Sequence, residues 1–132
     1  MITGGAGFIG ANLVLYWLRH HPDDLVVNFD ALTYAGNLGS LEDIKSLPNY
    51  RFFHGDLRNT LEISKAFSEH NIEAVIHLAA ESHVDRSIHG PADFIETNVT
   101  GTFNLLETAR EFWGDDLRKH RFLHVSTDEV YG

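Results

Sequence analysis

Short apolar runs alternate along this 132-residue chain with segments whose apolar residues recur at helical spacing. An unbroken apolar run of about 4–8 residues is typical of a strand that a sheet buries on both faces, and apolar residues at every third or fourth position are typical of a covering helix. After a stub at 1–3, the pattern predicts strands at 25–29, 50–56, 74–80 and 122–126, helices at 8–20, 60–69 and 92–113, and a loop with a short helix at 33–48.

Strands and helices that take turns along a chain indicate parallel strands joined by right-handed crossovers. We therefore predict an α/β fold, a doubly wound parallel sheet of the Rossmann-like kind with strand order 3-2-1-4-5. Residues 1–132 contain no internal repeat or interdomain linker, so we predict one domain. Its first strand is a short stub, whereas a strand ordinarily has roughly five or six residues, so we expect the domain to be incomplete at its front.

Composition narrows the classes of function. Nineteen acidic residues against ten basic ones leave a formal charge of −9, and the basic residues form no patch, which argues against binding to nucleic acid or an anionic membrane. No run reaches the roughly 18 apolar residues of a membrane span, and no signal peptide is recognisable. Cysteine is absent and the nine histidines form no ligand pair at helical spacing, so we predict a cytoplasmic protein without a metal site.

A glycine-rich turn, TGGAGFIG, lies between the first strand stub and the first helix. Gly5, Gly7 and Gly10 fit G-x-G-x-x-G, and Gly4 with the same two later glycines fits G-x-x-G-x-x-G. Either spacing lets backbone N–H groups approach a pyrophosphate at a helix N-terminus and lets the helix pack close to its strand. Glycine turns also occur for purely structural reasons, but the strand–turn–helix context favours dinucleotide binding.

Two aspartates follow the next two predicted strands. Asp30 ends a buried run about 20 residues after the glycine turn, where an acid that binds the adenosine ribose is expected. An acid at this place repels a 2′-phosphate, so NAD is favoured over NADP as the cofactor. Asp56 follows the third strand, where it either meets the adenine or serves as an ordinary turn or helix-cap aspartate.

Polar residues gather after the fourth strand, in the segment HLAAESHVDRS. Its two small alanines would let a flat ligand approach. Glu81, Ser82, His83, Asp85 and Arg86 follow them at the sheet edge where open α/β folds bind ligands. The alternative is a solvated loop in which an aspartate and an arginine form a local ion pair.

The last segment, STDEVYG, places hydroxyls and two carboxyls directly after the fifth predicted strand. Residues 126–129 fit a capping box in which Glu129 reaches back to the N-cap residue Ser126. They also fit a ligand crevice in which Asp128 and Glu129, in different surroundings, hold different pKa values and act as acid and base.

Together these segments resemble the dTDP-glucose 4,6-dehydratases, which belong to the extended short-chain dehydrogenase/reductases. TGGAGFIG, DALTYAGNL, GDL, HLAAESHVDRSI, ETNVTGT and STDEVYG follow one another in the order and spacing of that family over the entire chain. The glycine motif and the segment around Asn98 are shared with nucleotide-sugar epimerases and indicate only the superfamily. ESHVDRS and TDEVYG are narrower signals, because the epimerases usually carry small or hydroxyl residues in place of Asp128 and Glu129.

The resemblance implies NAD as the cofactor and a nucleotide sugar, dTDP-glucose, as the substrate. Thr127, Asp128 and Glu129 would be catalytic, and Ser82 and Thr127 would contact the sugar. The residues that it implies at the cofactor are Gly4, Gly7, Phe8, Ile9, Gly10, Asp30, Ala31, Leu32, Thr33, Asp56, Leu57, Leu78, Ala79, Ala80, Ser82 and Thr97.

The implied reaction oxidises C4 of the glucose with NAD, eliminates water across C5 and C6, and returns the hydride to C6. The product is dTDP-4-keto-6-deoxyglucose. By this resemblance Asp128 protonates the departing C6 hydroxyl, and Glu129 removes the C5 proton, which the C4 ketone has acidified. The resemblance also implies a homodimer, with the helix at 92–113 as a candidate contact face.

The Tyr-x-x-x-Lys pair of this family and the region that binds the sugar nucleotide are expected beyond Gly132. We therefore expect this chain to be an N-terminal portion, incomplete also at its end and without turnover of its own. Two alternatives stay open. One is an epimerase or reductase of the same superfamily, and the other is an NAD-binding or protein-interaction module that does no chemistry.

Overall fold

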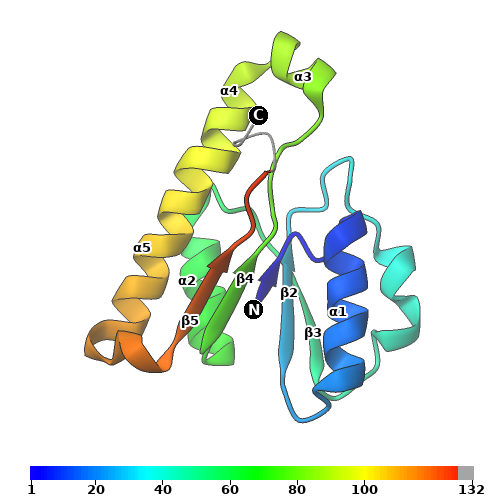
Figure 1. Cartoon of the computed structure of the whole chain (residues 1–132), viewed down its shortest axis with the longest axis vertical. Helices are drawn as coiled ribbons and strands as arrows, with labels where there is room; N and C mark the ends of the chain where they lie inside the picture. Colours follow the sequence, from blue (N-terminus) through cyan, green and yellow to red (C-terminus); the bar gives the residue numbers. More distant parts are fainter. Residues whose placement is uncertain (128–132) are drawn as a thin grey trace.

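The computed structural model describes residues 1–127, apart from the side chains of Val84, Arg86 and His89. Within this part, five parallel strands form a sheet with the order β3-β2-β1-β4-β5, which confirms the predicted topology (Figure 1). The strands are β1 (Ile2–Thr3), β2 (Val26–Asp30), β3 (Tyr50–His54), β4 (Ala74–His77) and β5 (Arg121–His124).

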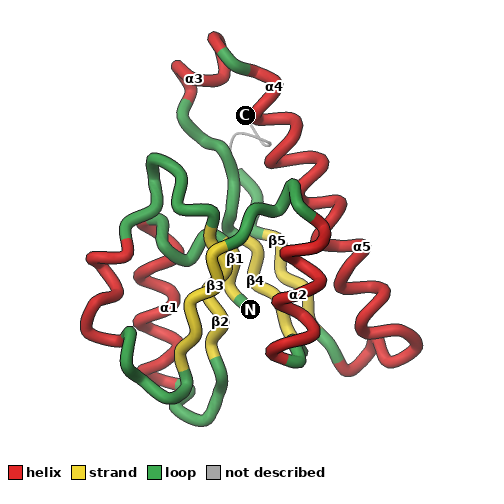
Figure 2. Tube along the Cα trace, turned by 180° about the vertical axis from the view of Figure 1, so that it is seen from behind, coloured by secondary structure: helices red, strands yellow, loops and turns green. Residues whose placement is uncertain are grey.

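Helices cover both faces of the sheet (Figures 1 and 2). On one face lie α1 (Phe8–His20) and the 3₁₀ helix η1 (Leu38–Ile44), and on the other lie α2 (Thr60–His70) and α5 (Thr102–Trp113). The other helical segments are α3 (Val84–His89), α4 (Pro91–Phe94), the π-helix η2 (Ile95–Gly101) and the 3₁₀ helix η3 (Gly114–Lys119).

Each face of the sheet has its own apolar core. β2 lies between the two cores and is therefore buried along its whole length. Val27 and Phe29 pack with Phe67 of α2 and Leu105 of α5. Val26 belongs to the cluster on the opposite face, with residues of α1 and η1. Burial on both faces is the reason that β2 is mainly apolar in the sequence instead of alternating between apolar and polar residues.

Three strands are shorter than the sequence predicted, and the first of them is β3, which covers 50–54 instead of 50–56. β4 covers 74–77 instead of 74–80 because its neighbour β1 ends at Thr3, after which the chain turns away at Gly4 with a φ of +70°. β5 covers 121–124 instead of 122–126, since β4 no longer offers it a partner. The residues that leave the sheet form loops at its carboxyl edge.

The helix predicted at 92–113 is present as α4, η2 and α5 in unbroken succession, with a π-helical middle part. It begins at Pro91, which suits a first helical turn because proline needs no N–H partner there. The sequence predicted neither α3 nor η3, and the residues of α3 were expected in a loop. Both segments span six residues, so a hydrophobic period has too little length to show.

A chain of hydrogen bonds crosses the sheet at His77, which is 1% exposed. Thr3 Oγ1 lies 2.6 Å from His77 Nδ1, and Thr102 Oγ1 lies 2.9 Å from His77 Nε2. The Thr102 hydroxyl donates its proton to the Asn98 carbonyl at 2.7 Å, so it accepts from Nε2–H and leaves Nδ1 to accept from Thr3. The neutral imidazole therefore forms one hydrogen bond with each of the two threonine hydroxyls. Burial, aided by the nearby His124, lowers the pKa of His77 to about 4.

We expect acid to destabilise the fold through His77. The ordinary histidine pKa of 6.5 lies above the folded value of about 4, so the unfolded chain binds the proton first. The contribution of the neutral imidazole is therefore complete above pH 6.5 and is lost as the pH falls toward about 4. A pKa difference of this size corresponds to roughly 3 kcal/mol.

Urea unfolding across this pH window measures the effect. His77→Gln should remove this part of the pH dependence, and His20→Gln, at an exposed position of α1, should leave it unchanged. An identical dependence on pH in wild type and His77→Gln would contradict the assignment.

Candidate functional site

A cavity of about 770 Å³ opens at the carboxyl edge of the sheet. Residues at or just after the ends of the five strands line it, namely Gly4, Asp30, Asp56, Ser82 and Thr127. Open α/β sheets bind ligands at this edge, where the strand order reverses, which here is between β1 and β4. The topology therefore defines a candidate binding crevice.

The glycine turn between β1 and α1 lines the part of the cavity next to the first helix. A Cβ at Gly10 would lie 2.0 Å from the Gly4 carbonyl oxygen, and a Cβ at Gly5 would lie 2.2 Å from Asn28 Oδ1. Gly7 is the N-cap residue of α1, and no side chain among the described residues caps the helix there. The N–H groups of this first turn are therefore available to an anion, which the N-terminus of a helix attracts.

Asp30 lies at the end of β2 and is 9% exposed. Its Oδ2 accepts from the Ala6 N–H at 2.9 Å, and its Oδ1 accepts from the Leu32 N–H at 2.8 Å. These bonds hold the carboxylate between the glycine turn and the loop that follows β2. Each oxygen keeps acceptor capacity, so Asp30 can also bind a pair of ligand hydroxyls.

The loop after β4 is held by a side chain from the long helix. Asn98 of η2 donates from Nδ2 to the Glu81 carbonyl and accepts at Oδ1 from the Glu81 N–H, both at 2.8 Å. The amide thus binds the Glu81 backbone as a neighbouring strand would. Ser82 follows on the cavity wall, and Thr97, next to Asn98, lines the cavity as well.

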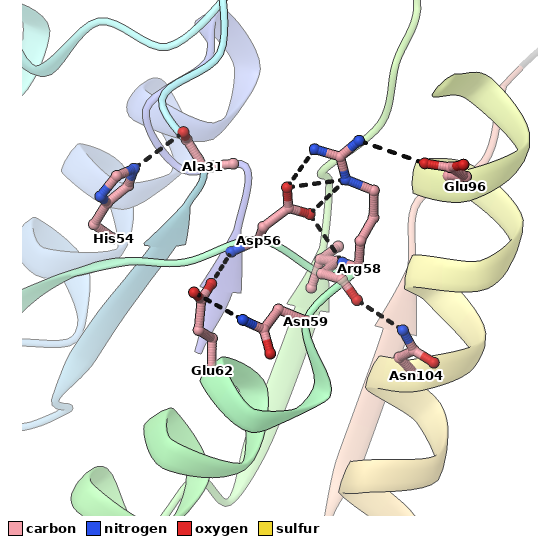
Figure 3. A network of polar contacts seen from close by, with 9 residues as sticks. Ala31, His54, Asp56, Arg58, Asn59, Glu62, Glu96 and Asn104 are labelled. Carbon is pink, nitrogen blue, oxygen red and sulfur yellow. Dashed lines mark hydrogen bonds and ion pairs between the residues drawn. The ribbon is translucent and has the colours of Figure 1, made fainter. Parts of the chain in front are cut away.

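Asp56, after β3, is fixed by Arg58 (Figure 3). The Arg58 backbone N–H and Nε donate to Asp56 Oδ1 at 2.9 and 3.1 Å, and Nε and Nη2 donate to Oδ2 at 3.0 and 2.6 Å. The hydrogen bonds from Arg58 are the main reason that the pKa of the Asp56 carboxyl lies below its usual range, since partial burial acts in the opposite direction. Asp56 is therefore an anion that accepts hydrogen bonds and donates none.

Most of the predicted cofactor residues line this one cavity. Of the sixteen residues named above for the cofactor, Leu32 alone does not line the cavity; its backbone N–H binds Asp30 instead. Asp128 and Glu129 lie outside the described residues. The alternative of a capping box at 126–129 is therefore not tested by the structure. The cavity also includes Glu81, from the polar cluster predicted after the fourth strand, and Ser126, from the last segment. The lining residues that the sequence did not assign to the site are Phe29, Tyr34, Ala35, Gly36, Gly55, Arg58, Asp93 and Val125.

The sequence could have indicated these additional residues only through their position along the chain. Most of them stand in the loops that directly follow the carboxyl ends of the strands, where any residue of a doubly wound sheet is close to the crevice. His83 is not among the lining residues, although its ring packs edge-on against Tyr34 with 6.1 Å between centroids.

Among residues 1–127, no group of three or more His, Asp and Glu residues is arranged to hold a metal ion. None of the helices in that range combines the length and apolar character needed to cross a membrane.

A doubly wound parallel sheet, a glycine turn that enters α1, and acids at the ends of β2 and β3 define a Rossmann-type α/β protein. The particular family follows from comparison with known proteins. The chain belongs to the GDP-mannose 4,6 dehydratase family, whose model matches residues 1–132.

Two dTDP-glucose 4,6-dehydratases are more similar in sequence to this chain than a 4-epimerase is. The chain is 55% identical over 136 residues to dTDP-glucose 4,6-dehydratase of Salmonella typhimurium, covering 100% of this chain and 37% of that protein. The structure of DesIV, a dTDP-glucose 4,6-dehydratase from Streptomyces venezuelae with NAD and TYD bound, matches with a TM-score of 0.86 at 47% identity, over 99% of this chain and 40% of that one. The UDP-Glc/GlcNAc 4-epimerase of Campylobacter jejuni matches with a TM-score of 0.84 at 28% identity, over 99% of this chain and 37% of that one. This chain therefore spans well under half the length of these relatives.

Proposed function

We propose that this chain binds NAD and supplies the acid and the base of the elimination step in a dTDP-glucose 4,6-dehydratase. The observation that carries the proposal is the cavity at which the glycine turn, Asp30 and Asp56 converge. The 55% identity to the Salmonella typhimurium dehydratase supports the reaction and the substrate, and NAD in the Streptomyces venezuelae structure supports the cofactor. Because the chain spans 37% of that first relative, the activity of the whole protein is part of the proposal.

The residues of the cavity fit NAD. A volume of about 770 Å³ lies within the range of ligand pockets. The pyrophosphate would lie at the N-terminus of α1, at Gly7 and Phe8, the adenosine ribose at Asp30, and the adenine beside Asp56 and Leu57. The other contacts would come from Gly4, Ile9, Gly10, Ala31, Thr33, Leu78, Ala79, Ala80, Ser82 and Thr97, which also line the cavity.

When bound, NAD would accept a hydride from C4 of the sugar and later return it to C6. The chain's own residues carry out the step between these transfers. Glu129 takes the C5 proton, the electrons of that C–H bond form a C5–C6 double bond, and the C6–O bond breaks as Asp128 protonates the leaving hydroxyl to give water. Ser82 and Thr127, both on the cavity wall, would hold the sugar. Adjacent carboxyls thus serve adjacent carbons of one substrate.

We expect the pair of substitutions Asp30→Ala and Ala31→Arg to move the cofactor preference of the chain from NAD toward NADP by roughly 100-fold. The change removes the repulsion of a 2′-phosphate and supplies an attraction for it. Titration calorimetry with each dinucleotide measures the ratio of the two affinities. Asp43→Ala, at an exposed position of η1, is the control. If the ratio is the same as in the wild type, Asp30 does not meet the ribose.

We also propose a cytoplasmic homodimer. The absence of cysteine supports the location. An exposed apolar stripe on η2 and α5 supports the assembly, because such surfaces mark interaction sites. Its side chains are Ile95, Val99, Phe103 and Leu106, with exposed fractions of 59%, 58%, 60% and 44%.

We expect Phe103→Lys to weaken self-association by at least about 10-fold, because it places a charge in the middle of this stripe. Sedimentation velocity over a range of protein concentrations measures the change. Thr100→Lys adds the same charge at another exposed position of the helix and is the control. If the sedimentation coefficient of Phe103→Lys depends on protein concentration as that of the wild type does, this face is not the dimer contact.

A further inference from the structure

We propose that Arg58 sets the base selectivity of the cavity, by holding Asp56 as a charged acceptor with room for one exocyclic amino group. The inference rests on the proposed NAD site and deepens it. It specifies the ligand at this end of the cavity as a purine that carries an amino donor. Both residues line the cavity, and both belong to the loop between β3 and α2.

The hydrogen bonds at Asp56 limit what a ligand can add. A carboxylate offers about four acceptor sites. Three N–H groups of Arg58 use most of them: the backbone N–H on Oδ1, Nη2 on Oδ2, and Nε shared between the two oxygens. About one site is left, which matches the single N–H that an amino group directs at one acceptor.

Further contacts make this acceptor rigid (Figure 3). The Asp56 N–H donates to Glu62 Oε2 at 2.7 Å, and Asn59 Nδ2 donates to Glu62 Oε1 at 3.0 Å. On the other side, Arg58 Nη1 lies 3.6 Å from Glu96 Oε2 of η2. The guanidinium therefore bridges the β3–α2 loop and the long helix, and its fork keeps the Asp56 carboxylate in one orientation.

An anionic acceptor distinguishes two purines that have nearly the same shape. Adenine presents an amino donor at C6 and completes a hydrogen bond to Asp56. Hypoxanthine presents a carbonyl oxygen at C6, which meets the carboxylate as one acceptor facing another. Without Arg58 the carboxylate would lose the hydrogen bonds that fix its orientation. It could then rotate away from the base, and discrimination would fall.

The test compares the affinities of the 132-residue chain for NAD and for nicotinamide hypoxanthine dinucleotide by calorimetry. We expect the wild type to prefer NAD by about 10-fold or more, the typical effect of a hydrogen bond to a charged group. Arg58→Met should bring the ratio close to one, and Arg58→Lys, which keeps the charge but lacks the fork, should restore only part of it. Arg110→Met is the matched control and should leave the ratio unchanged. Arg110 makes a similar fork to Glu107, at 3.1 and 2.8 Å, on α5.

A double-substitution cycle separates this inference from the NAD site itself. Asp56→Asn should also abolish the preference, and adding Arg58→Met to it should change the ratio no further. A preference retained in both Arg58 variants while Asp56→Asn abolishes it would overturn the role of Arg58 and leave the proposed function standing. A preference retained in Asp56→Asn would also overturn the inference. If the wild-type chain binds neither dinucleotide, the inference and the proposed function are both overturned.

Discussion

In the proposed dehydratase, Glu129→Gln is expected to lower kcat by about 10²–10⁴-fold, the range for loss of a general base. Glutamine keeps the shape of glutamate but cannot take the C5 proton. Oxidation at C4 and binding of NAD do not depend on this carboxyl, so they should continue. The absorbance of the reduced nicotinamide should therefore rise in a single turnover and persist, because elimination stalls behind it.

This experiment needs a complete enzyme, and a chimaera provides one. In it, residues 1–132 of this chain replace the matching part of the Salmonella typhimurium dehydratase, an exchange that 55% identity over the whole chain supports. The unsubstituted chimaera sets the baseline, and Glu73→Gln, at an exposed position before β4, is the matched control. In heavy water, deuterium entry at C5 of the substrate reports the proton removal directly.

The capping-box alternative makes a different prediction for Glu129→Gln. Loss of a cap costs roughly 0.5–2 kcal/mol of stability and leaves catalysis intact in the folded fraction. Normal product formation together with normal C5 exchange would therefore assign Glu129 to a helix terminus and remove it from the mechanism.

Gly10→Ala is expected to destabilise the chain by roughly 3 kcal/mol or more and to abolish NAD binding. The new Cβ would lie 2.0 Å from the Gly4 carbonyl oxygen and 2.7 Å from the Gly5 Cα. Both are backbone atoms, so no side-chain rotation relieves the contact, and α1 must move away from β1. The movement displaces the N-terminus of α1 from the place where the pyrophosphate would bind.

Gly7→Ala provides the contrast within the same motif. Its Cβ would approach the Gly4 carbonyl oxygen only to 3.3 Å, and we expect a loss of less than about 1 kcal/mol. Urea unfolding compares the stability of the two variants, and calorimetric titration with NAD measures binding to Gly10→Ala. If Gly10→Ala unfolds at the same urea concentration as the wild type, close packing of α1 on β1 is not what this glycine provides.

The strand order and the edge of the sheet that holds the site could be read from the sequence. Both depend on local signals: the apolar period of each segment, the glycines of the turn, and the positions of Asp30 and Asp56 after their strands. A parallel α/β alternation leaves few topologies, and in each of them the carboxyl ends of the strands meet at one edge. The predicted residues therefore converged on one cavity even though the strand ends were misplaced.

Other features arise from contacts between residues that are far apart in the sequence. β4 ends at His77 because of where β1 ends, and that histidine is neutral because it is buried in the folded sheet and because His124 lies close to it. Arg58 reaches Glu96 only after the β3–α2 loop and η2 have come together. Local propensity contains no information about such partners, since pairing, burial and charge neutralisation depend on which distant segments the fold brings into contact.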